Sequence, residues 1–263
     1  MTDSSGLAHV LEAGPKSPNK KYKNPPVIEA LVFIRVAPAT APIAALEGVV
    51  PEVPIRYPNR QSVSTSAFTI DLQNPKDAST TAQQIGYRYA SEDNTKVVQV
   101  RTDGFVFSRL APYPADGWDE WMPEARQLWA RYNAVVGPQS VTLLQVRYAN
   151  RIPVPTVQWR PSDYLTTYPW VGPGLPPIAQ YILRAEFPIP KIPGARLAVN
   201  QGTLYDPTNP PGASILLDLE VSKSVELEPD DPQVWDTIEV LHRCETAAFE
   251  ASITDTSRAM FNQ

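Results

Sequence analysis

Charged side chains that could bind an anion or transfer a proton recur at alternate positions in several apolar segments of this chain. A clear example is Leu217-Asp218-Leu219-Glu220-Val221, in which each carboxylate stands between aliphatic residues. Residues that alternate in this way point to opposite faces of a β-strand, so the charged members share one face of a sheet. The residues predicted to form this polar face are Arg35, Asp71, Arg101, Arg147, Arg184, Glu186, Asp218 and Glu220.

Such a face is open to two kinds of chemistry. The planar guanidinium group of arginine pairs with carboxylates and phosphates, so an open face could bind a protein partner, an anionic ligand or a second copy of the chain. If the sheet curved until its charges converged, the same array could support acid–base or phosphate chemistry in a hydrolase. The simplest alternative is a solvated face with cross-strand ion pairs, each worth about 0.2–1 kcal/mol.

The sequence lacks the patterns of the common catalytic and cofactor-binding centres. Its two histidines, His9 and His242, stand apart from other metal ligands and from any nucleophile. His242 falls on the apolar stripe of a predicted helix, where a hydrogen-bonded core histidine is the expected role. No glycine-rich phosphate loop follows a predicted strand, since Gly172-x-Gly174 lies among prolines. We therefore predict no catalytic residue, no metal site and no cofactor, and we favour a non-catalytic role while leaving enzymatic activity open.

Composition favours a cytoplasmic protein. The 28 acidic and 23 basic residues give a net charge of −5, so no overall field would attract a phosphate backbone. Nucleic acid is expected only at the N-terminal lysines, and the expected partner is a protein or a second copy. One cysteine, Cys244, excludes an intrachain disulfide, and no apolar run of about eighteen residues predicts a membrane span. The N-terminal lysines are Lys16, Lys20, Lys21 and Lys23.

Short strands and two long amphipathic helices must position the charged residues. Alternating apolar residues and turn signals mark the strands, and apolar residues at spacings of three and four mark the helices. The helices are predicted over 118–136 and 232–253. The strands are predicted over 27–36, 67–72, 85–89, 97–101, 105–109, 141–148, 181–187, 196–199 and 214–221.

The chain repeats one plan. Trp118-Asp119 and Trp235-Asp236 open the two long helices and stand 117 positions apart. We interpret this offset as an internal duplication, with repeats over 24–138 and 139–263 that form one compact unit after a disordered tail over 1–23. The predicted fold class is α+β: an antiparallel sheet of about eight strands, either open or curved towards a barrel, with both helices on one face.

A set of short motifs resembles a sporadically distributed bacterial protein family of about this length, which has no assigned function. The motifs lie between residues 24 and 261 and include Asn24-Pro-Pro-Val-Ile-Glu-Ala30, Val146-Arg-Tyr-Ala-Asn-Arg-Ile152 and Phe249-Glu-Ala-Ser-Ile-Thr-Asp255. The patchy occurrence of the family is compatible with mobile-element, toxin–antitoxin or phage-defence systems. The resemblance implies no catalytic residues. The predicted function is a non-catalytic interaction protein, and the alternative is a phosphate-handling hydrolase that uses the Arg and carboxylate array.

Overall fold

The centre of the protein is one antiparallel sheet. A computed structural model describes residues 21–37, 41–50, 55–69, 79–154, 159–172, 174–176, 178–205 and 213–263. Nine strands follow the order β2-β3-β4-β5-β1-β6-β9-β8-β7, so β2 and β7 form two separate edges. The sheet is open, which makes the barrel alternative wrong, and it has nine strands where about eight were expected.

The elements are as follows. The strands are β1 (Val27–Val36), β2 (Asn59–Thr69), β3 (Ser79–Ala90), β4 (Lys96–Arg101), β5 (Gly104–Leu110), β6 (Val141–Pro153), β7 (Ile182–Pro188), β8 (Ala195–Tyr205) and β9 (Ala213–Leu227). The helices are the 3-10 helix η1 (Ile43–Val49) and the α-helices α2 (Trp118–Val136), α3 (Pro161–Tyr164), α4 (Gln233–Ser252) and α5 (Asp255–Phe261).

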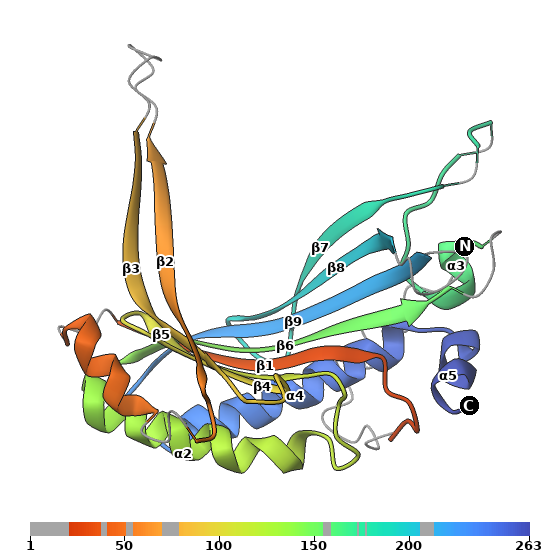
Figure 1. The fold of residues 1–263 in the computed structure, drawn as a ribbon. Coiled ribbons are helices and arrows are strands. Elements are labelled where there is room, and N and C mark those ends of the chain that lie inside the picture. The colour runs from red at the N-terminus through yellow and green to blue at the C-terminus, as the bar shows by residue number, and fades with distance from the viewer. Residues whose placement is uncertain are drawn as a thin grey trace.

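The hairpin formed by β2 and β3 is longer than its sequence suggests. Strand β2 begins at Asn59, and its polar run Asn59-Arg-Gln-Ser-Val-Ser-Thr-Ser66 has no apolar alternation that would predict a strand. Pairing with β3 forms it instead, with a register shift between Val63 and Ser64. Figure 1 shows this hairpin rising from one end of the sheet while β7 rises at the other, on the side away from α2 and α4. The face without helices is therefore concave.

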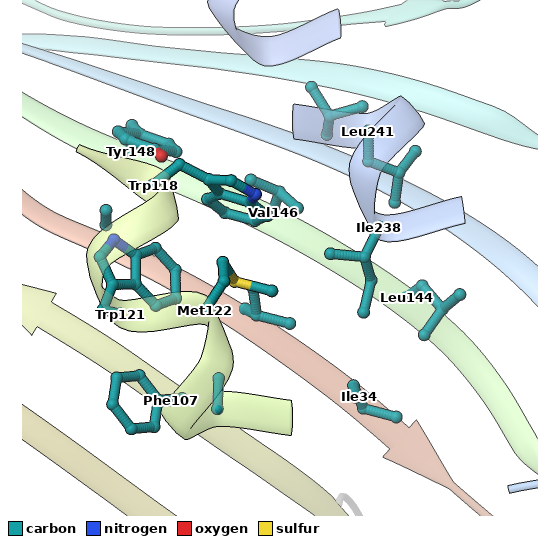
Figure 2. Close-up of a cluster of buried hydrophobic side chains, with 14 of the residues drawn as sticks. Ile34, Phe107, Trp118, Trp121, Met122, Leu144, Val146, Tyr148, Ile238 and Leu241 are labelled. Atoms are coloured by element: carbon teal, nitrogen blue, oxygen red, sulfur yellow. The ribbon is translucent and has the colours of Figure 1, made fainter. Parts of the chain in front are cut away.

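The other face of the sheet carries the hydrophobic core. Alternate residues of the central strands, such as Val32, Val146 and Leu219, are fully buried beneath α2 and α4. Phe107 of β5 stacks on Trp121 of α2 with ring centroids 5.7 Å apart. Figure 2 shows that α2 and α4 both contribute to one apolar cluster on β1, β5 and β6. Burial of each large apolar side chain stabilises the fold by about 1.5–3 kcal/mol. Within the described part of the chain, every helix is too short or too polar to cross a membrane.

Candidate functional site

The helix-free face carries the described members of the predicted polar face. Arg147 of β6 is the register partner of Leu31 on β1 and of Glu220 on β9. Its chain neighbours on β6, Val146 and Tyr148, are buried on the helix side. Because successive strand residues point to opposite faces, the Arg147 side chain points away from α2 and α4.

A carboxylate pair holds Arg147 at the middle of this face. Arg147 donates from Nε to Asp218 Oδ1 at 2.7 Å and from Nη2 to Asp218 Oδ2 at 2.9 Å. Glu29 Oε2 lies 3.8 Å from Arg147 Nη1. The hydrogen bonds to Asp218 raise the pKa of the guanidinium further above its ordinary value. Asp218 is only 7 % exposed, so most of this pair is shielded from water.

A second pair lies at the β7 edge. Arg184 donates to Glu186 Oε1 at 2.6 Å and to Asn200 Oδ1 at 2.7 Å. Both charged side chains are exposed, so solvent screens their interaction. Ile182, two residues before Arg184 on the same face, is 91 % exposed.

A row of arginines and glycines crosses the other half of the face. Arg35 of β1 pairs with Gly104 of β5, which pairs with Arg101 of β4, which pairs with Gly86 of β3. The guanidinium carbons of Arg35 and Arg101 lie 5.5 and 5.8 Å from the centroid of the Phe33 ring. Gly104 leaves room for the Phe33 ring, since a Cβ there would lie 2.7 Å from Phe33 Cε2.

The charges of the face are spread out. Arg101 and Arg184 stand six strands apart in the sheet order, which corresponds to about 29 Å at the usual strand spacing. Arg101 forms a separate ion pair with Asp103, in which Nε and Nη2 each donate to a carboxylate oxygen at 2.7 Å. Asp71 lies outside the described residues. The structure therefore brings Arg147, Asp218 and Glu220 together on adjacent strands and places Arg35 and Arg101 around the Phe33 ring. The Arg184–Glu186 pair lies apart from both groups.

Arg88 and Arg196 are among the arginines of this face that the sequence analysis missed. Arg88 of β3 pairs in register with Gln99, and Arg196 of β8 pairs with Ser222. Both positions alternate with apolar neighbours, which was the available signal. Among the described residues, no group of three His, Cys, Asp or Glu side chains is arranged to hold a metal ion.

A cavity of about 520 Å³ lies on the opposite side of the sheet. Three segments far apart in the sequence enclose it together with β6: residues 21–27, residues 113–119 before and at the start of α2, and one face of α4. Tyr22 fixes the first segment, because its hydroxyl donates to Glu250 at 2.6 Å and its ring packs edge-on against Phe261. Tyr22, which the predicted tail included, is thus packed against α4 and α5.

Aromatic rings and buried polar groups line the cavity. Trp118 stacks on His242 with ring centroids 4.0 Å apart. The hydroxyls of Tyr113 and Tyr148 are 3.0 Å apart, and that of Tyr148 lies 3.5 Å from His242 Nδ1. Burial, reinforced by the charge of Arg243, lowers the pKa of His242 to about 4. The imidazole is therefore neutral at physiological pH.

Glu245 is the most unusual residue of the cavity wall. It is 3 % exposed, and its Oε1 atom has no hydrogen-bond partner. Burial first, and repulsion by Asp218 second, raise its pKa well above the ordinary value. Its position on the helical stripe was visible in the sequence. The cavity beside it was not, because the segments that enclose it are distant in the chain.

Comparison with known proteins adds no functional assignment to these structural observations. A scan against protein-family models found no match to this chain, and a search of curated proteins found none either.

Proposed function

We propose that this chain is a non-catalytic binding protein whose helix-free face binds a protein partner with an acidic surface. The observation that carries the proposal is an excess of arginine on that face in a chain of net charge −5. Arg35, Arg88 and Arg196 form no ion pair with any described residue. Guanidinium groups of this kind recognise carboxylates through paired hydrogen bonds.

Shape and apolar contacts support the same proposal. The face is concave and open, so a folded partner could reach many of its strands at once (Figure 1). Ile182 offers an exposed apolar side chain beside the polar pair of β7. Interfaces commonly combine a few apolar anchors with a charged surround that selects the partner.

We further propose that the broad face arose by duplication of one unit. Strands β1 and β6 lie antiparallel at the centre of the sheet. Outward from this centre the order is β1-β5-β4-β3-β2 in one half and β6-β9-β8-β7 in the other. In each half the last strand in sequence pairs with the first and leads into α2 or α4. A duplicated unit would double the binding face without a new fold.

The hydrolase alternative receives less support. Acid–base or phosphate chemistry would require several charged groups to converge on one reacting atom. Here Arg147, Arg101 and Arg184 are each engaged by a nearby carboxylate, and the pairs lie on strands that are far apart.

Site-specific photocross-linking tests the proposed face. A benzophenone side chain at Gln145, at the centre of the helix-free face, should cross-link an acidic protein in cells of the source organism. The matched control places it at Gln127, an exposed position on the outer side of α2. In the Gln145 background, Arg35→Glu with Arg88→Glu should reduce the cross-linked product about tenfold, because like charges would then meet the partner.

The outcomes separate the candidate partners. A cross-link to a second copy of the chain would identify self-association through this face. The proposal would be contradicted if the probe at Gln127 cross-linked the partner equally well, or if the cross-linked product were a nucleic acid. It would also be contradicted if the two arginine substitutions left the amount of product unchanged.

A further inference from the structure

The cavity between α4 and residues 21–27 lies on the helix side of the sheet, so it is separate from the proposed protein-binding face. Its volume of about 520 Å³ is within the range of small-molecule sites. Glu245 lines it with an unpartnered, almost fully buried carboxyl oxygen. A buried polar atom without a partner normally costs about 1–3 kcal/mol, so an unpartnered carboxyl group in a cavity wall is a candidate to bind a ligand group.

The remaining wall favours positive charge. Trp118, Tyr148 and Phe249 contribute aromatic rings to the lining. Aromatic faces attract cations by their negative quadrupole, most strongly where water is excluded. The acidic lining residues outnumber the basic ones: they are Asp116, Asp119, Glu245 and Glu250, against Lys21 and Lys23.

The basic residues do not neutralise the interior. Lys21 Nζ lies 4.0 Å from Asp116, and both side chains are exposed at the rim. Glu250 already accepts from Tyr22 and Arg258. Glu245 therefore remains the one carboxyl group among the described lining residues with an oxygen buried and unpartnered.

We infer that this cavity binds an organic cation, an ammonium or guanidinium group on an apolar body, with Glu245 as its carboxylate partner. The cation pairs with the carboxyl group of Glu245, and the rings pack around the apolar body. A ligand carboxylate would instead lie beside the carboxyl group of Glu245 in a poorly hydrated cavity, where like charges repel. A neutral ligand would gain no charge–charge attraction to Glu245.

Binding should release a proton. The titratable groups coupled to Glu245 are Tyr113, Tyr148 and, across the sheet, Asp218, and none of them supplies a positive charge. Burial raises the pKa of the carboxyl group and so favours its protonated form. A bound cation favours the ionised form, so complex formation should lower the pKa of Glu245 and release protons.

Three probes with the same phenylethyl body test the inference: phenethylamine (cationic), 2-phenylethanol (neutral) and 3-phenylpropionate (anionic). Isothermal titration calorimetry on the full chain should show phenethylamine binding at least about tenfold more tightly than either other probe. Titrations in buffers of different ionisation enthalpy should show proton release with the amine.

Glu245→Gln should weaken amine binding about tenfold or more and abolish the proton release, while 2-phenylethanol binding is unchanged. The matched control is Asp236→Asn, which removes an exposed carboxylate from the same helix outside the cavity and should leave all three affinities unchanged. Equal or tighter binding of 2-phenylethanol, full amine affinity in Glu245→Gln, or no amine binding at millimolar concentration would each overturn the inference.

Discussion

Burial decides what the same chemical groups do at different places in this protein. Arg147–Asp218 and Arg184–Glu186 are both guanidinium–carboxylate pairs on the helix-free face. The first is shielded and held by two hydrogen bonds, so it stabilises the join between β6 and β9. The second is exposed, and such pairs contribute about 0–1 kcal/mol, so it adds little to the stability of the fold.

His242 makes the stability of the protein depend on pH. Its pKa is lowered from 6.5 to about 4 in the fold, so the unfolded chain binds a proton that the folded chain refuses. The corresponding stability is present above pH 6.5 and is lost as the pH falls towards about 4. Over that window the free energy of unfolding of wild type should fall by about 2–3 kcal/mol relative to His242→Gln.

Urea unfolding of both proteins at several pH values measures this difference. The comparison isolates His242 from Glu245, whose raised pKa has the opposite effect: stability falls as the pH rises above its unfolded value. A difference between the two proteins that stays constant across the window would contradict the assignment.

At the scale of elements, glycines allow neighbouring strands and long side chains to fit together. Gly86 stands opposite Arg101 in the β3–β4 pair, and a Cβ there would lie 2.1 Å from the carbonyl oxygen of Val100. That contact is with backbone, which cannot rotate away. Gly86 therefore allows β3 and β4 to pair closely at the position of Arg101.

Gly86→Ala should destabilise the fold by about 1–3 kcal/mol, because the strands must separate to admit the methyl group. The matched control is Gly48→Ala in η1, where the nearest atoms would be Val135 methyl carbons at 3.9 Å. That substitution should leave stability unchanged or raise it by up to about 1 kcal/mol. Urea midpoints test the pair, and equal effects of the two substitutions would argue against a steric role for Gly86.

At the scale of the whole molecule, the two halves depend on each other. Strands β1 and β6 pair along most of their length at the centre of the sheet. Trp118 of the first half donates to Glu239 of the second, and Trp129 donates to the carbonyl of Pro229. One hydrophobic core extends beneath both helices (Figure 2).

Fragments 21–138 and 139–263 should therefore fail to fold when expressed separately. Each would expose a central strand edge and half of the core, and small domains tolerate little such loss. Near-ultraviolet circular dichroism should show no fixed aromatic packing in either fragment, and mixing them should restore it. A native-like spectrum from one fragment alone would show that the halves are independent domains.

Local patterns predicted much of this architecture. The limits of α2, the strand β1 and the sorting of Arg147 and Asp218 away from Val146 and Leu219 follow from periodicity, which is a property of neighbouring residues. The polar half of β2 escaped prediction because its strand conformation comes from pairing with β3 and not from its own residues.

The sequence by itself determined which side chains share a face, because that depends only on the repeat of the backbone conformation. The tertiary structure alone decided which strands are neighbours, that the sheet stays open, and which arginines find carboxylates. It also decided the cavity, since residues 21–27, 113–119 and the Glu245 turn of α4 meet only when the chain is folded. No local signal records a contact between segments separated by more than eighty residues.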